Sequence, residues 1–502
     1  MIITITLVVA SLLELIDVTI VNVAITNIAD SFGADLSTIA WLIAGYSMAT
    51  AIVVPITGRL AAIFGRRRYF IGSILLFTFS SFMCGQSGSI NALIFWRIVQ
   101  GAGGGALLAT ANTVLVEIYP DDMVGFANSM FGIGAVLGPA IGPILGGYLV
   151  SNYAWPWIFY VNIPIGILAA VLSMIYIKEP PQKMKVGAFD WQGLLFLIIG
   201  VGALQVVLEQ GAHASWFKSN YIIFLTIAAT IGITSFIYWE IKKAKNPMVD
   251  LTILKNREVI LGSIFIFILG VGLFGSLFLL PIFQQRLLGF SAFQSGLSFI
   301  PAGVASFIMM PALGILLKKG TSPRLLATIG LGLFAVSLFM FSWQDLQPEG
   351  IIMGDFFLPM VLNGIGKTCL FVPLMTITMS RLKGADIAQG AGLANMSRLL
   401  GGSFGVALTA TFINYRSVFY RSRLATNISN YNHGTEPWVD QLTQFFMGKE
   451  AGLIKETHQV YAILESSLVK NVVQLSYSDA FFCIGLFFLF CIPCMLFIRK
   501  VK

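Results

Sequence analysis

The sequence predicts an all-α integral membrane protein with fourteen transmembrane helices, arranged as two six-helix halves with two extra helices between them. Of the 502 residues, 57% are hydrophobic and only 11% are charged, against about 25% in a typical soluble chain. The apolar residues occur in runs of about 20, the length that spans a bilayer as a helix. An internal repeat, whose two copies lie eight spans apart, indicates the two halves.

The predicted spans must be helical, because an open sheet in lipid would leave backbone groups without hydrogen-bond partners. They cover residues 3–28, 39–61, 69–86, 91–118, 124–150, 157–177, 191–210, 220–240, 259–281, 293–317, 323–343, 354–380, 388–414 and 477–498.

The basic residues orient the predicted bundle, because cytoplasmic loops carry an excess of Lys and Arg. Twenty of the 31 Lys and Arg residues lie in loops after even-numbered spans or in the C-terminal tail. Eight lie on the other side, six of them in one long loop. We therefore expect a multi-pass protein with both termini cytoplasmic. The same distribution argues against nucleic-acid binding, despite a pI near 9.2.

The internal repeat appears in two pairs of spans. PITGRLAAIFGRRR from Pro55 matches PALGILLKKGTSPR from Pro311, and GAGGGALLAT from Gly101 matches GIGKTCLFVP from Gly364. Parallel halves of this kind build the major facilitator fold, with a substrate cavity at the midplane. Chance similarity between glycine-rich helices would give the same pattern, and this comparison by itself does not separate the two.

The repeat predicts three regions. Residues 1–178 form the N-terminal half, 179–257 the two extra helices with cytoplasmic connectors, and 258–502 the C-terminal half. The last region includes a long outer loop, 415–476, whose segment Ile454–Leu475 is amphipathic enough to form a helix.

Ionisable side chains inside the spans are candidates for function, because each costs about 2.5–3.5 kcal/mol to insert at a helix centre. Glu14 and Asp17 share one face of the first span. Burial disfavours the charged form of an acid, so we expect Asp17 to carry a proton, with Glu14 as its helper. Arg97, on the fourth span, is the cation expected to modulate this pair.

Further polar residues predict the substrate cavity, since several share a helix face inside a span. They are Asn22, Gln100, Asn363, Lys367, Asn395 and Arg398. The alternative is that these groups form buried structural ion pairs. Glu117 and Glu209 lie nearer span ends and are interpreted as headgroup-level residues.

The fifth span is rich in Gly and Pro. Small residues four apart let helices approach closely, and prolines kink a helix. The residues concerned are Gly134, Gly138, Pro139, Gly142, Pro143 and Gly146. We interpret them as a bent seam between the halves that seals or hinges the cavity; close packing alone is the simpler alternative.

Several segments resemble signatures of the major facilitator superfamily. GRLAAIFGRRR (58–68) is similar to its loop signature, RIVQGAGGG (97–105) to its fourth-span motif and GIGAVLGPAIGPILGGY (132–148) to its antiporter motif. LELIDVTIVNVAI (13–25) resembles the first span of fourteen-span drug:proton antiporters. LQVVLEQGAHASWF (204–217) and NPMVDLTILKNREVILG (246–262) resemble EmrB-type multidrug exporters.

This resemblance implies a bacterial inner-membrane exporter that exchanges drugs or toxic small molecules for protons. It implies a gating role for Gly58, Arg59, Gly65, Arg66 and Arg67, although topology alone explains much of this basic cluster. A periplasmic adaptor protein and an outer-membrane channel are the implied partners. The chain departs from the family in two places: Ala62 and Ile63 replace an acid and a base of the loop signature, and Lys367 lies deep in the twelfth span.

The leading hypothesis is thus a proton-coupled antiporter for amphipathic drugs. The alternative is a dedicated exporter of an anionic metabolite, such as a siderophore or fatty acid, which would explain Lys367 and Arg398. The sequence has no GxxxxGK[ST] phosphate loop. Its three histidines lie in predicted outer loops, and its five cysteines lie in apolar runs. We therefore expect no enzyme activity, metal or cofactor.

Overall fold

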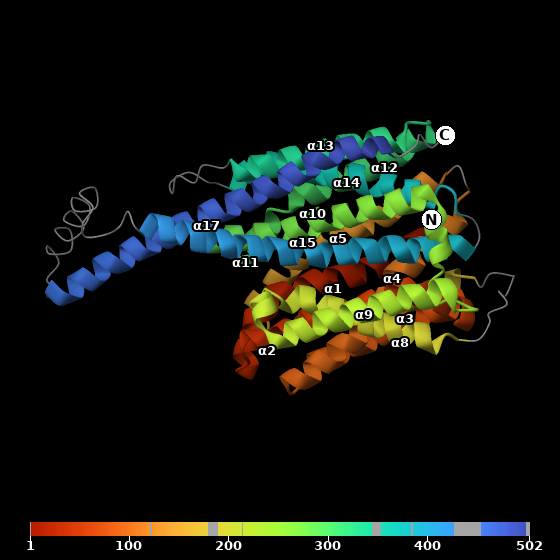
Figure 1. The fold of residues 1–502 in the computed structure, drawn as a ribbon, viewed down its shortest axis with the longest axis horizontal. Helices are drawn as coiled ribbons and strands as arrows, with labels where there is room; N and C mark the ends of the chain where they lie inside the picture. Colours follow the sequence, from red (N-terminus) through yellow and green to blue (C-terminus); the bar gives the residue numbers. More distant parts are fainter. Residues whose placement is uncertain are drawn as a thin grey trace.

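The computed structural model describes residues 2–120, 123–178, 189–212, 214–343, 353–382, 385–425 and 453–497. These residues form a bundle of long, roughly aligned helices (Figure 1). In the N-terminal part the helices are α1 (Ile2–Phe32), α2 (Leu36–Phe64), α3 (Arg66–Gly85), α4 (Ile90–Ile118), α5 (Val124–Asn152), α6 (Trp157–Tyr160) and α7 (Asn162–Tyr176). These are followed by α8 (Trp191–Gln210), α9 (Asn220–Lys242), α10 (Arg257–Leu287), α11 (Ala292–Leu297), α12 (Ile300–Lys318), α13 (Pro323–Ser342), α14 (Phe357–Met379), α15 (Ala385–Ala425) and α17 (Leu453–Cys494).

Within this described part, thirteen helices are long and apolar enough to cross a membrane. Helices α6 and α7 together form one of these spans, and α11 with α12 another. Helix α5 is a further apolar helix of 29 residues, packed between α1 and α12. Counting α5, each of the fourteen predicted spans corresponds to a helical segment of the structure.

The same helix pairings occur in both halves. Helix α1 contacts α4, α5 and α7, and α10 contacts α14, α15 and α17 in the same way. Helix α4 packs on α2 and α3, as α14 packs on α12 and α13. The halves meet where α5 contacts α12 and where α2 contacts α15. This arrangement is the major facilitator fold, and it explains why the repeat has an offset of eight spans.

Two glycines show that the repeat extends to single contacts. A Cβ on Gly101 would meet the Tyr46 carbonyl oxygen of α2, and one on Gly364 would meet the Ala302 carbonyl oxygen of α12. One turn further, Thr50 Oγ1 donates to the Gly101 carbonyl at 3.1 Å, and Ser306 Oγ donates to the Gly364 carbonyl at 3.0 Å. Both glycines are needed because the backbones touch there.

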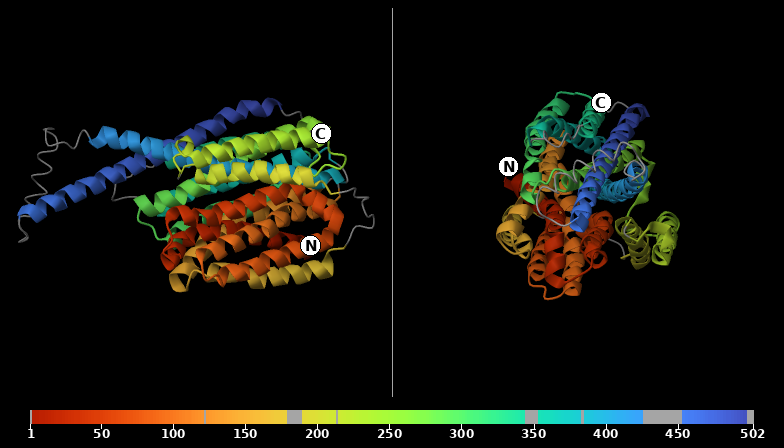
Figure 2. Two further views of the ribbon diagram at one scale, coloured as in Figure 1. Left: turned by 60° about the horizontal axis from the view of Figure 1, so that its bottom comes forward. Right: turned by 90° about the vertical axis from the view of Figure 1, so that its left-hand side faces the viewer.

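The extra helices α8 and α9 pack on each other and lie to one side of the bundle (Figure 2). Gly200 and Gly232 allow the close crossing, since a Cβ on Gly200 would lie 2.6 Å from the Ile233 nitrogen. Helix α8 also contacts α2 and α15, so the pair lies beside one of the two contacts between the halves. The residue limits predicted for the three regions remain a prediction.

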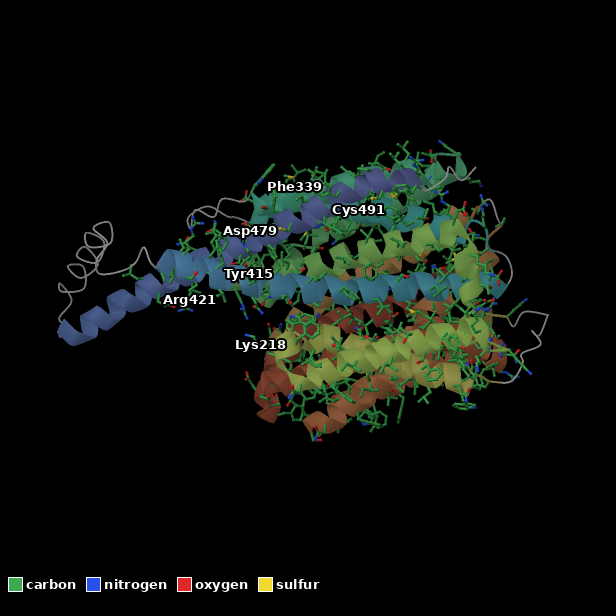
Figure 3. All side chains as sticks on the ribbon, in the orientation of Figure 1. Lys218, Phe339, Tyr415, Arg421, Asp479 and Cys491 are labelled. Carbon is green, nitrogen blue, oxygen red and sulfur yellow. The ribbon has the colours of Figure 1, made fainter. Side chains whose placement is uncertain are left out.

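Helices α15 and α17 are much longer than predicted and extend beyond the other helices as a projection (Figure 1). The helix predicted at Ile454–Leu475 is confirmed, as the first part of the 42-residue α17. Arg416 forms an ion pair with Asp479, and Tyr420 Oη donates to Asp479 Oδ2 at 2.8 Å. Figure 3 labels Arg421 on the projecting part of α15 and Asp479 on α17, nearer the bundle. Residues 426–452 of the predicted outer loop lie outside the described residues.

Candidate functional site

Asp17 lies at the centre of a buried polar network in the N-terminal half. Its Oδ2 accepts from Arg97 Nη1 at 2.5 Å, so the two side chains form an ion pair with both partners almost fully buried. Its Oδ1 accepts from Gln100 Nε2 at 2.9 Å and from Asn162 Nδ2 at 2.8 Å. Three donors from α4 and α7 therefore satisfy one carboxylate on α1.

The surroundings of Arg97 hold its guanidinium in place. The group lies 4.2 Å from the centroid of the Tyr46 ring, a distance at which a cation is attracted by the ring face. Its Nη1 also donates to Gln100 Oε1 at 2.8 Å. Ser81 Oγ accepts from Gln100 and from Asn162, which completes the network. The structure thus brings the predicted Asp17, Arg97 and Gln100 together.

Tyr46, Ser81 and Asn162 belong to this network although the sequence did not single them out. Ser81 and Asn162 are polar residues inside apolar spans, and that is a usable signal. Tyr46 carries no such signal, because an aromatic residue in a span more often faces lipid or core.

Glu14 has a different environment from Asp17, although both are buried. Its side chain and the Tyr46 hydroxyl both lie against Gly104, because a Cβ there would be 3.4 Å from Glu14 Cγ and 2.5 Å from Tyr46 Oη. Neither Glu14 Oε2 nor Tyr46 Oη has a hydrogen-bond partner among the described residues. Arg398 on α15 lies within electrostatic range of Glu14, from the other half of the protein.

Arg398 and Asn395 are both buried on α15. Arg398 Nε and Nη2 and Asn395 Oδ1 lack hydrogen-bond partners in the described part of the chain. Buried polar atoms are nearly always paired, so unpaired ones mark a place where a ligand or water belongs. The unpaired atoms of Glu14 and Arg398 come from the two halves, and this is the geometry expected of a central binding site.

Lys367 is buried on α14, with Nζ 5.6 Å from the centroid of the Phe334 ring. Among the described residues no carboxylate lies within 4.0 Å of it, which distinguishes it from Arg97. Asn363, one turn earlier, donates from Nδ2 to Ser337 Oγ at 3.1 Å. The last predicted cavity residue, Asn22, is exposed.

The predicted gating loop makes contacts with two neighbouring helices, although Ala62 and Ile63 stand where the family signature has an acid and a base. Gly65 adopts φ 87°, which lets the chain turn between α2 and α3. Arg66 forms an ion pair with Glu117 of α4, and Arg67 donates to the Met174 carbonyl of α7. Arg59 is half-buried on the last turns of α2, whereas Gly58 lies against Ala388 of α15, 3.4 Å from where a Cβ would be.

The two acids interpreted as headgroup-level residues both make contacts between helices, and that interpretation stays a prediction. Glu117 is the ion-pair partner of Arg66. Glu209 is half-buried and accepts from Gln205 Nε2 at 3.2 Å, while Gln205 also donates to Ser403 Oγ of α15 at 2.5 Å. Contacts between helices, which the sequence does not reveal, determine where both side chains lie.

Helix α5 meets the other half at α12, so its predicted role as a seam that seals or hinges the cavity stays a prediction, but the four predicted glycines face α1 instead. A Cβ on Gly138 would lie 2.5 Å from Leu15 Cβ, and Gly134, Gly142 and Gly146 also face α1. They therefore pack α5 against α1 inside one half. Gly132 faces Met310 and Phe371 of the other half instead. Pro143 is half-buried, and the side chain of Pro139 lies outside the described residues.

Comparisons with known proteins agree with this architecture. The family model of the Major Facilitator Superfamily matches residues 7–406. The chain is 34% identical to the multidrug export protein EmrB of Escherichia coli K12, over 88% of this chain and 85% of the relative. It is 33% identical to the fatty acid resistance protein FarB of Neisseria gonorrhoeae, over 91% of this chain and 89% of that protein.

Solved structures share the fold at low sequence identity. The human organic anion transporter MFSD10 superposes with a TM-score of 0.59 at 12% identity, over 97% of this chain and 98% of that one. The proton:xylose symporter XylE superposes with a TM-score of 0.58 at 15% identity, over 98% and 95%. The matched family model and these relatives show that the chain belongs to the Major Facilitator Superfamily.

Proposed function

We propose that the chain is a proton-coupled secondary antiporter that exports amphipathic drugs or toxic small molecules by alternating access. The observation that carries the proposal is a pair of buried ionisable side chains, Glu14 and Arg398, one from each half, whose atoms Glu14 Oε2, Arg398 Nε and Arg398 Nη2 have no hydrogen-bond partner among the described residues. Two relatives, from Escherichia coli and Haemophilus influenzae, are named multidrug export proteins, and both are 34% identical to this chain.

In this mechanism Asp17 and Arg97 act as a buried pair that shapes the site. Removing one partner of such a pair leaves an uncompensated charge, so each side chain depends on the other for its place in the site. Proton uptake at Asp17 would free Arg97 from its partner and loosen the contact between α1 and α4. Asp17 accordingly remains a candidate carrier, as its position in the sequence predicts.

Glu14 is the carboxylate that the contacts favour for exchange with the cavity. Its oxygen Oε2 has no hydrogen-bond donor among the described residues, whereas Asp17 accepts three hydrogen bonds. A proton on Glu14 would cancel its attraction to Arg398, and a polar or cationic substrate would compete with the proton for the same carboxylate. Competition at one site is the minimum that antiport requires.

Glu14→Gln and Asp17→Asn, each mimicking a permanently protonated acid, test these roles in proteoliposomes with an imposed pH gradient. If Glu14 exchanges the proton, Glu14→Gln loses uphill transport but keeps substrate–substrate exchange. Asp17→Asn then loses both, because Arg97 is left buried without its partner. Uphill transport by Glu14→Gln at the wild-type level would refute the role of Glu14, and the same result for Asp17→Asn would refute that of Asp17.

A second cargo class is favoured by Lys367, a buried cation without a carboxylate partner in the described part of the chain. Together with Arg398 it would suit an anionic metabolite such as a fatty acid or siderophore. Efflux of cationic dyes against organic anions from cells with and without the protein separates the two cargo classes. Export of anions alone would replace the drug-export proposal with the anion one.

Gating is proposed for Gly58, Arg59, Gly65, Arg66 and Arg67. Gly58 contacts Ala388 at the junction of α2 and α15, and a conformation open on that side must separate them. A cysteine pair at Gly58 and Ala388 should cross-link and stop transport, and reduction should restore it. Cross-linking without any effect on transport would exclude this junction from the gate.

For localisation we propose the bacterial inner membrane, with both termini cytoplasmic. Helix α1 begins and α17 ends at the same end of the bundle, opposite the projection (Figure 1). The projection formed by α15 and α17 would then reach into the periplasm, where it could contact an adaptor protein that leads to an outer-membrane channel. Deleting 454–475 should abolish export across the envelope but leave exchange in proteoliposomes intact; loss of both would give the segment a purely structural role.

A further inference from the structure

An apolar cavity of about 200 Å³ lies between the extra helices and the contact of α2 with α15. Its walls include Pro55 of α2, Val201 of α8, Phe236 of α9 and Leu393 of α15. The connector after α9 closes one end with Val249 and Leu251. Every lining residue is apolar, so the cavity is separate from the polar groups around Glu14 and Arg398.

The chemistry of the walls determines what can occupy the cavity. An ordered water needs two to four polar partners, and these side chains offer none. Any occupant must therefore be apolar. Helix α9 is largely unburied within the protein, and Ile227, Ile231 and Ile237 on it are exposed. In a membrane this surface faces lipid, so acyl chains are the apolar groups closest to the cavity.

A group of exposed lysines lies at the end of α9 and on the connector that follows it. Lys242, Lys243, Lys245 and Lys255 flank the wall residues Val249 and Leu251 in the chain. Within the described ranges, no carboxylate lies within 4.0 Å of these ammonium groups. Basic clusters beside a transmembrane helix attract anionic lipid headgroups, because the headgroup and the ammonium groups meet at the membrane surface.

We propose that this cavity binds one acyl chain of an anionic phospholipid, whose headgroup is held by the connector lysines. The lysines complement the charge of the headgroup, and the cavity accommodates the acyl chain. Neither feature would select this lipid by itself. The proposal concerns lipid binding and does not depend on the cargo or on proton coupling.

The site would influence transport through α15. Leu393, Met396 and Leu400 line the cavity, while Asn395 and Arg398 belong to the central polar group. A Cβ on Gly392 would lie 3.5 Å from the Pro55 carbonyl oxygen, so α2 and α15 touch beside the cavity. A chain lodged there lies next to a contact that must change when the halves rock, and we expect anionic lipid to change the exchange rate.

Native mass spectrometry of the full-length protein, with added phosphatidylglycerol or phosphatidylcholine of identical chains, tests the proposal. The wild type should retain phosphatidylglycerol several-fold better. The triple variant Lys242→Gln, Lys243→Gln, Lys245→Gln should lose this preference but still retain phosphatidylcholine. Val201→Trp, which fills the cavity, should lower retention of both lipids several-fold.

Matched controls are Ile231→Trp, an exposed position on α9 outside the cavity, and the double variant Lys318→Gln, Lys319→Gln in another loop. Both should behave as the wild type. An unchanged lipid preference in the triple variant would overturn the headgroup site, and this surface variant is expected to fold. Displacement of phosphatidylglycerol by tetraphenylphosphonium, one for one, would assign the cavity to cargo and overturn the lipid proposal. The lipid-binding measurement needs no proton gradient, so its failure can be distinguished from a failure of proton-driven export.

Discussion

The two halves share their backbone contacts but differ in their buried ionisable side chains. If Gly101 corresponds to Gly364, then Gly104 corresponds to Lys367, so a glycine beside Glu14 is replaced by a cation in the other half. The N-terminal half supplies Glu14, Asp17 and Arg97, with Asp17 and Arg97 paired. The C-terminal half supplies Lys367 and Arg398, neither of them in an ion pair among the described residues.

This difference suggests a division of labour between the halves. A repeated helix arrangement preserves the packing positions, because backbone contacts tolerate only small residues there. The polar positions are not constrained in this way, and their charged side chains differ between the halves. In the proposed mechanism the exchanging acid would lie in one half and the cations that recognise cargo in the other, so each role should respond separately to mutation.

The largest effect on stability is expected for Arg97→Ala. It leaves Asp17 as an uncompensated buried charge, and breaking such a pair costs about 3–5 kcal/mol. Arg398→Ala should cost less, because Arg398 has no direct ion-pair partner within the described ranges. Thermal unfolding in detergent measures both. If the two variants were equally destabilised, the contrast between the halves would be wrong; the double variant Asp17→Asn, Arg97→Gln should recover part of the loss.

The repeated close contacts predict an equal effect in the two halves. Gly101→Ala and Gly364→Ala each place a methyl group against a backbone carbonyl, and overpacking of this kind costs about 1–3 kcal/mol. Gly72→Ala and Gly332→Ala on α3 and α13 are the controls, since nothing lies within 4 Å of a Cβ at either position. A lower unfolding temperature for only one of the two variants would show that the two contacts are not equivalent.

Lys367→Met tests the difference between the halves through cargo preference. The substitution removes a buried cation without removing an ion pair of the described structure, so stability should be unchanged or slightly higher. Cargo preference should shift toward cationic or neutral compounds. Efflux of a panel of charged and neutral compounds measures the shift, with Phe334→Leu as a control for the ring beneath Lys367. An unchanged profile would remove Lys367 from the recognition site.

The smallest effect is expected in the projection. Arg421 and Glu465 form an exposed ion pair, and such pairs contribute about 0–1 kcal/mol. Arg421→Ala should therefore leave the unfolding temperature almost unchanged. Arg416→Ala should lower it more, because Asp479 also accepts from Arg416 Nε at 2.6 Å. The reverse order would mean that the outer part of α15 and α17 contributes more to stability than the part near the bundle.

The candidate site could be predicted from the sequence where polarity itself is the signal. Glu14, Asp17, Arg97 and Arg398 stand out because a charge inside an apolar span is costly. The sequence ranks Asp17 above Glu14 because it gives no information on partners. The contacts show three donors around Asp17 and, on Glu14, an oxygen without a partner among the described residues. The groups around these two acids lie on α4, α7 and α15, which are separated from α1 in the sequence.

Length, hydropathy and the internal repeat determined the helices, their approximate limits and the two-half arrangement, because a bilayer leaves the chain few alternatives. Only the tertiary structure decided which helix faces which. It turned four glycines of α5 toward α1, paired Arg66 with Glu117, and joined Glu209 to α15 through Gln205 and Ser403. The physical reason is that helical periodicity defines the faces of a helix, whereas the partner of each face depends on packing between segments far apart in the sequence.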